Sequence, residues 1–213
     1  IPIQATLNAH HRHRYTLGIG YGTDTRARGS LGWVNRHINK RGHNLKAKIE
    51  VSRIKNSFTG RYEIPIRDPR TDKIAFTTAW IDDDPETSES ETLLWGLSRT
   101  LSKRINWLET IYLNYQSETF TIANTEDTTR LLIPGITWSR LRADDRINIR
   151  KGRRLILDIK GGIGSDTNLL QARLNSKLIS TINSNSKFIF RADLGASIVE
   201  DFSELPASLR FYT

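Results

Sequence analysis

The chain contains 213 residues with a mass of 24.4 kDa, enough for one large domain or two small ones. Its 32 Lys and Arg residues outnumber its 23 Asp and Glu residues, so the formal net charge is +9 and the isoelectric point lies near 10.0. The absence of cysteine excludes disulfide frameworks, zinc knuckles and thiol nucleophiles. The sequence also lacks the apolar run of about 18 residues that a transmembrane helix requires. Because it starts with Ile1 and carries no recognisable signal sequence, we expect a mature product or a fragment.

Period-two alternation of apolar and polar residues runs through the chain and predicts β-strands with one apolar face. The clearest example is residues 45–51 (LKAKIEV), in which Leu, Ala, Ile and Val alternate with Lys, Lys and Glu. The same pattern predicts eleven strands, which include residues 15–21, 27–34, 45–51, 58–66, 74–80, 93–97, 105–115, 132–138, 155–159, 170–178 and 188–198.

Residues typical of turns separate these strands, for example the sequence NKRG at 39–42. Short links tend to alternate with longer polar loops, except for a longer link at 142–151 where a short one is expected. This alternation predicts a barrel with one short rim and one long rim, which is typical of outer-membrane barrels. The expected short links are 38–42, 67–72, 102–104 and 182–186, and the expected long loops are 82–90 and 116–129.

The alternative to a membrane barrel is a soluble β-sandwich or a lipocalin-like barrel, whose strands also alternate. Three features favour the membrane barrel. Each strand with its connection averages about 17 residues, more than the spacing of about 8–12 residues in sandwiches. The polar face is charged in the middle of strands, as at Lys48, Arg61 and Asp158, whereas many apolar positions are Ala or Gly, too small to fill a soluble core. Aromatic residues are expected near strand ends, as interfacial girdles require, at Trp80, Trp95, Trp107, Tyr112, Tyr115 and Trp138.

The odd strand number is itself informative. Bacterial single-chain barrels have an even number of strands. Eleven strands in a bilayer would leave an edge whose backbone groups have no water to bond. Either the pattern miscounts the strands by one, or the chain covers only part of a barrel.

Three segments resemble a known family: residues 15–33 (YTLGIGYGTDTRARGSLGW), 131–145 (LLIPGITWSRLRADD) and 205–213 (LPASLRFYT). They are similar to the TamA-like barrels of the bacterial surface antigen superfamily, which also includes BamA and two-partner secretion transporters. The resemblance implies an all-β, antiparallel, up-and-down transmembrane barrel that is incomplete, with about eleven of sixteen strands. It also implies that residues 1–14 are the end of a periplasmic POTRA domain and its linker, and that residues 15–213 are the barrel, truncated before closure.

The function implied by this resemblance is the assembly or translocation of outer-membrane proteins such as autotransporters, without a chemical step or a cofactor. The implied partners are substrate outer-membrane proteins, lipid and lipopolysaccharide, and the inner-membrane protein TamB through periplasmic domains that are absent from this chain. The implied localisation is the bacterial outer membrane. The family's Arg-Gly-Tyr loop and its closing strands are also absent from the sequence.

The first predicted strand is the candidate site. Gly18, Gly20 and Gly22 remove side chains from one of its faces, which weakens pairing with a neighbouring strand. We predict that Leu17, Gly18, Ile19, Gly20 and Tyr21 form a lateral gate that receives substrate strands through their backbone groups. The alternative is that the glycines only relieve crowding where strands tilt. A dinucleotide loop is excluded because no helix follows these glycines.

Other motifs are weaker. The histidines of the HHRH sequence (His10, His11 and His13) have no carboxylate at ligand spacing, so a solvated rim is favoured over a metal site. The acidic run at 82–86 lacks EF-hand spacing and is interpreted as a solvated loop. The positive charge is spread over all strands, without a nucleic-acid-binding motif, and no nucleic-acid partner is expected. Three cations near strand ends could instead meet lipid phosphates: Arg99, Lys103 and Arg140.

Two alternative functions stay open. The first is a passive pore or polypeptide-transport channel whose charged interior selects solutes. The second is an outer-membrane hydrolase, for which carboxylates near the loops are the candidate residues: Asp24, Asp82 and Asp166.

Overall fold

A computed structural model describes residues 11–23, 25–85, 89–103, 106–122, 125–145, 147–164, 168–183, 186–200 and 207–210. Residues 1–10, where the end of a POTRA domain is expected, lie outside these ranges. The strands are β1 (His13–Gly22), β2 (Arg26–Asn35), β3 (Asn44–Ser52), β4 (Lys55–Pro65), β5 (Lys73–Asp83), β6 (Glu89–Lys103), β7 (Trp107–Ile122), β8 (Thr125–Ala143), β9 (Lys151–Gly164), β10 (Asn168–Asn183) and β11 (Ser186–Val199). A short 3-10 helix, η2 (Ala207–Leu209), follows them. Within the described ranges, no helix has the length and apolar character needed to cross a membrane.

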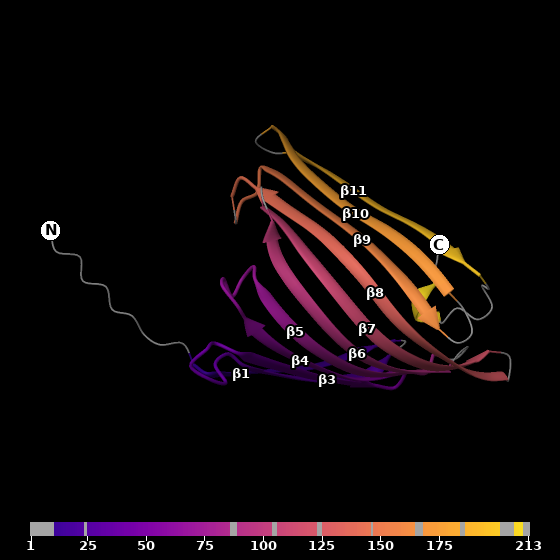
Figure 1. The fold of residues 1–213 in the computed structure, drawn as a ribbon. Helices are drawn as coiled ribbons and strands as arrows, with labels where there is room; N and C mark the ends of the chain where they lie inside the picture. Colours follow the sequence, from indigo (N-terminus) through magenta and orange to yellow (C-terminus); the bar gives the residue numbers. More distant parts are fainter. Residues whose placement is uncertain are drawn as a thin grey trace.

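The strands form one antiparallel sheet in which each strand pairs with its neighbours in the sequence. The sheet curves into an open trough, with β1 and β11 at its two edges (Figure 1). This confirms the predicted all-β, up-and-down class, and each of the eleven predicted strands coincides with an observed one. We call the end of the sheet where β1 begins the N-terminal rim and the other end the opposite rim.

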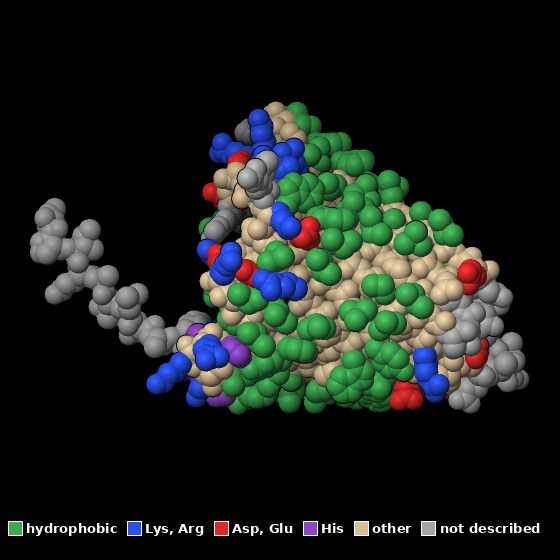
Figure 2. All heavy atoms as spheres, in the orientation of Figure 1, with side chains coloured by type: hydrophobic (Ala, Val, Ile, Leu, Met, Phe, Trp, Pro, Cys, Tyr) green, Lys and Arg blue, Asp and Glu red, His purple; other side chains and the backbone are tan. Residues whose placement is uncertain are grey.

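The two faces of the sheet differ in polarity as the alternation predicts. The outer face carries apolar side chains that lie opposite one another across successive strands (Figure 2). One such row runs from β2 to β6 through Leu31, Ile49, Phe58, Trp80 and Leu93. These five side chains are all exposed. The buried apolar cluster of the described residues is small by comparison and lies on the inner face: Leu131, Ile133, Leu169 and Leu209. A continuous exposed apolar face of this kind needs an apolar environment.

The loop predicted at 116–129 is wrong. β7 continues to Ile122 and β8 begins at Thr125, so most of this segment is strand. The hydroxyls of Thr119 and Thr128 lie 3.0 Å apart across the hairpin. A polar run imitates a loop in the sequence, but backbone pairing between strands does not depend on apolar side chains. Likewise, the loop predicted at 82–90 is only 84–88.

The predicted contrast between rims fails for the same reason. The links at the opposite rim are short, as at 53–54, whereas the N-terminal rim has longer links at 36–43 and 66–72. The longer link predicted at 142–151 is confirmed at 144–150.

The aromatic residues follow the girdle prediction only in part. Trp107 and Trp138 lie near the N-terminal rim on the outer face, but Trp95 and Tyr115 pair in the middle of their strands. Tyr112 lies on the inner face, where its hydroxyl donates to Asp158 over a distance of 3.1 Å. Its ring covers Gly135 on the next strand, where a Cβ would overlap the ring. Tyr112 therefore packs against a glycine of the inner wall rather than joining a girdle.

The register predicts opposite outcomes for two neighbouring positions of β3. Ile49→Arg places a charge on the outer face and should cost about 2–4 kcal/mol if the position lies near the bilayer midplane. Lys48→Arg, on the inner face, should leave stability almost unchanged because the Lys48–Glu50 ion pair tolerates either cation. Denaturant unfolding of the full-length protein in lipid vesicles measures both. Equal effects of the two substitutions would show that the faces are assigned wrongly.

Candidate functional site

Strand β1 is an edge strand, which is the geometry that the predicted gate needs. One side of it pairs with β2 over its whole length, and the other side has no strand beside it within the described residues. The outer side chains of Leu17, Ile19 and Tyr21 are exposed, with Ile19 at 88%. Within the described residues the backbone groups on this side have no strand partner, and the same holds for the side of β11 that faces away from β10. All five residues of the predicted gate, Leu17 to Tyr21, lie in this strand.

The glycines of β1 face inward, alongside polar side chains of β2. A Cβ at Gly18 would lie 2.5 Å from Ser30 Oγ, and a Cβ at Gly20 would lie 2.8 Å from Arg28 Nε. Both neighbouring atoms belong to flexible side chains. The glycines thus leave the inner side of β1 open and give room to the β2 side chains. This arrangement is compatible both with a lateral gate and with glycines that only relieve crowding between tilted strands.

A polar hollow adjoins this part of the inner face. It has a volume of about 450 Å³, and its walls come from β1 to β5 and the turns that join them. Its charged lining residues are Arg28, Glu50, Lys55 and Asp83, the last two joined by an ion pair of 3.0 Å. The inner side of the edge strand therefore faces a wet, charged space, whereas its outer side is apolar.

The histidine of the HHRH sequence that β1 contains, His13, packs against an aromatic ring of β2. His13 Nδ1 accepts a hydrogen bond from Trp33 Nε1 at 3.3 Å, and the two rings stack with centroids 6.0 Å apart. His10 lies outside the described residues. Across the described parts of the chain, no group of three or more His, Cys, Asp or Glu side chains is placed to hold a metal.

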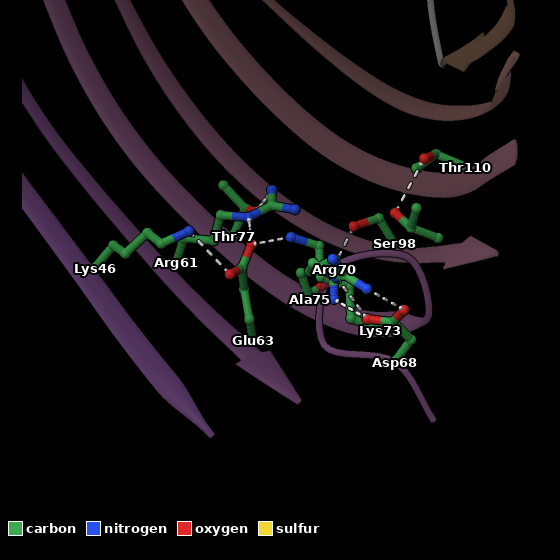
Figure 3. Close-up of polar contacts among 11 residues, drawn as sticks. Lys46, Arg61, Glu63, Asp68, Arg70, Lys73, Ala75, Thr77, Ser98 and Thr110 are labelled. Atoms are coloured by element: carbon green, nitrogen blue, oxygen red, sulfur yellow. Dashed lines mark hydrogen bonds and ion pairs between the residues drawn. The ribbon is translucent and has the colours of Figure 1, made fainter. Parts of the chain in front are cut away.

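A carboxylate with three cationic partners lies on the inner wall near the N-terminal rim (Figure 3). Glu63 on β4 accepts from Lys46 of β3, Arg61 of β4 and Lys73 of β5, each at 2.9 Å. The Glu63 side chain is buried, whereas its partners are partly exposed. The group joins three neighbouring strands, and its three cations outnumber its single anion. Alternation in the sequence places these residues on one face but does not reveal that they meet.

Residues 207–210 lie on the inner wall near the opposite rim. Gln116 Nε2 donates to Ser208 Oγ at 2.8 Å, and Gln171 Nε2 donates to the Leu209 carbonyl at 2.7 Å. Glu118, which is buried, accepts a hydrogen bond from the Ser208 hydroxyl. Helix η2 therefore packs inside the trough against β7 and β10. The resemblance singled out residues 205–213 but gave no position for them on the wall.

Of the three carboxylates of the hydrolase alternative, the structure describes only Asp82. Asp82 lies on the outer face of β5 and accepts from Asn56 Nδ2 at 3.2 Å. Its neighbour Asp83 points to the inner face and pairs with Lys55. Asp24, Glu86 and Asp166 lie outside the described residues.

Comparisons with known proteins support the fold. No family model matches the sequence. The structure is similar to the crystal structure of BamA from Haemophilus ducreyi lacking POTRA domains 1–3, with a TM-score of 0.72 and 11% sequence identity. The match covers 92% of this chain and 42% of that chain, so this chain spans less than half of its neighbour's length. The likeness shows that the open sheet has the fold of a BamA barrel wall, and the narrower TamA assignment stays a prediction.

The Glu63 cluster predicts a measurable contribution to stability. Glu63→Gln leaves Lys46, Arg61 and Lys73 close together without their anion, and should lower the free energy of unfolding by about 1–3 kcal/mol. The matched control is Glu50→Gln on the same face, because Glu50 pairs only with an exposed lysine among the described residues. The control should cost less than about 1 kcal/mol. Equal losses in denaturant unfolding would contradict a role of the cluster in joining β3, β4 and β5.

Proposed function

We propose that this chain forms part of the wall of an outer-membrane barrel that assembles or translocates other outer-membrane proteins, autotransporters among them, without a chemical step. The observation that carries the proposal is strand β1, whose inward-facing positions 18, 20 and 22 are glycines and whose backbone groups have no neighbouring strand on one side within the described residues. No water reaches such groups inside a bilayer, so a strand of a client protein is a suitable partner for them. The fold shared with a BamA barrel wall supports this kind of function.

The gate of this barrel comprises Leu17, Gly18, Ile19, Gly20 and Tyr21. Its glycines forgo cross-strand contacts worth about 0.2–1 kcal/mol each, so a strand paired here is held less firmly than elsewhere in the sheet. The polar hollow inside Gly18 leaves space for inward-facing polar side chains of an arriving strand. The gate then selects substrate strands by backbone pairing and by the alternation of polar and apolar residues along those strands.

The partners follow from this role. Strands of outer-membrane proteins bind at β1, and lipid and lipopolysaccharide surround the apolar outer face. An inner-membrane partner of the TamB type would bind through periplasmic domains outside this chain. With β1 emerging from those domains, the N-terminal rim faces the periplasm.

Crosslinking tests the gate directly, because the chain contains no cysteine of its own. In the full-length protein, Ile19→Cys or Thr16→Cys should form a disulfide with a cysteine in the terminal strand of a substrate during assembly. Ile49→Cys on β3 is the control, since that strand is paired on both sides. Trapping of substrate on gels at β3 as readily as at β1 would contradict the gate.

Locking the seam separates the gate from the alternative role of the glycines. A disulfide between Thr16→Cys and the strand that closes the barrel against β1 should stop assembly, and reduction should restore it. The control joins Thr16→Cys to Gly32→Cys across the existing β1–β2 pair, where a Cβ at Gly32 would lie 3.6 Å from Thr16 Cβ. Normal assembly by the first locked protein would rule out the gate, and a steady single-channel conductance would then favour the passive pore.

A further inference from the structure

Three arginines gather on the outer face at the N-terminal rim. Arg140 and Arg142 belong to β8, and Arg153 of β9 lies directly opposite Arg142 in the register. Like charges opposite one another on neighbouring strands are destabilising, so this arrangement calls for a compensating anion. Figure 2 shows Lys and Arg side chains concentrated at this end of the molecule, beside the apolar outer surface.

These arginines differ from the other cations of the same rim. Arg99 pairs with Asp72 at 3.3 Å and Lys103 pairs with Glu109 at 3.2 Å, so two of the three cations expected to meet lipid are already neutralised. Within the described residues, Arg140, Arg142 and Arg153 have no acidic partner.

Arg140 is held in place without being neutralised. Its guanidinium lies 5.4 Å from the ring centroid of Trp107, and its Nε is buried without a hydrogen-bond partner among the described residues. A cation stacked on an aromatic ring keeps its charge and its free donors. The stacking therefore fixes a donor group at the rim that can still bind an anion.

A cavity of about 600 Å³ opens beside Arg142 and Arg153. Lys151 adds a third cation to its lining, and Leu178 adds an apolar wall. The acidic residue that lines this cavity is Asp144. Its carboxylate accepts hydrogen bonds from the backbone N–H groups of Lys151 and Arg150, at 3.0 and 3.1 Å. The Lys151 N–H is the largest cause of an Asp144 pKa below the ordinary value. This carboxylate thus holds the turn and forms no ion pair with the arginines.

We propose that this cavity binds the phosphate headgroup of an anionic phospholipid in the leaflet at the N-terminal rim, with Arg142 and Arg153 as its main donors and Arg140 beside them. Arginine presents paired N–H groups that match phosphate geometry. A lipid fits better than free phosphate because Arg142, Arg153 and Leu178, which line the cavity, all belong to the outer face, where the apolar surface meets the rim. Trp107 and Trp138 lie on the same face at this rim, as residues at a membrane–water interface do.

The site rests on the membrane setting of the proposed function but not on the gate. Native mass spectrometry of the full-length protein, with phosphatidylglycerol titrated into a neutral detergent, measures lipid retention directly. Arg142→Gln combined with Arg153→Gln should weaken retention by about tenfold or more. The matched control, Arg99→Gln combined with Lys103→Gln, removes the same charge from cations that already have partners and should leave retention unchanged.

Three further readouts make the result decisive. Circular dichroism checks that each variant keeps its sheet, and Arg140→Gln alone provides a milder variant that should also weaken retention. Inorganic phosphate at the same concentration should not displace the lipid; displacement would assign the site to free phosphate and overturn the lipid proposal. Equal retention by the Arg142/Arg153 variant and the control would overturn it as well. Crosslinking at Ile19, measured on the same variants, reports the gate separately.

Discussion

Backbone hydrogen bonding without water is the constraint on which this structure depends. Inside a bilayer every N–H and C=O must find a partner in the protein, which restricts spanning structures to helices and closed barrels. Ten ladders join the eleven strands in chain order, so the nine strands between β1 and β11 have a neighbour on both sides over much of their length. Within the described residues, β1 and β11 are the strands that have a neighbour on one side only, and the gate proposed at β1 concerns one of these two edges. The apolar outer face and the charged inner face are consequences of the same environment.

Charged groups are compensated differently at two places in the sheet. On the inner wall, anions and cations meet within the sheet, as Glu63 does with Lys46, Arg61 and Lys73. At the N-terminal rim of the outer face, Arg142 and Arg153 lie opposite each other, and neither has an acidic partner among the described residues. Internal pairing suits a wall that must hold its shape around a wet interior, and unpaired arginines suit a rim that meets phosphate groups in its surroundings.

Much of the fold could be predicted from the sequence because side chains alternate with period two along a strand. The alternation at 45–51 assigns each residue to a face, and all eleven strands were predicted in this way. It failed at 116–129, because a run of Thr, Ser and Glu has the composition of a loop but pairs as a hairpin. The girdle prediction also misplaced Tyr112, because the distance of a residue from the end of its strand does not reveal which face of the sheet its side chain lies on.

The contacts of the site could not be predicted, for a different reason. The pattern within one strand does not reveal the register of its neighbours, so neither the meeting of Lys46, Glu63 and Lys73 nor the opposition of Arg142 and Arg153 could be foreseen. The residues proposed as the gate were chosen from the glycines of one strand, and their role stays a prediction. Their position at a free edge follows from β1 being the first strand of a sheet built in chain order.

The central claim is that the apolar face meets lipid and the polar face meets water. Spin labels placed one at a time on residues 45–51 of the full-length protein, reconstituted in vesicles, test it most directly. Collision rates with oxygen, which is enriched in lipid, should peak at positions 45, 47, 49 and 51. Rates with a water-soluble nickel complex should peak at 46, 48 and 50. The reverse alternation, or uniform access of the nickel complex to all seven positions, would contradict the account.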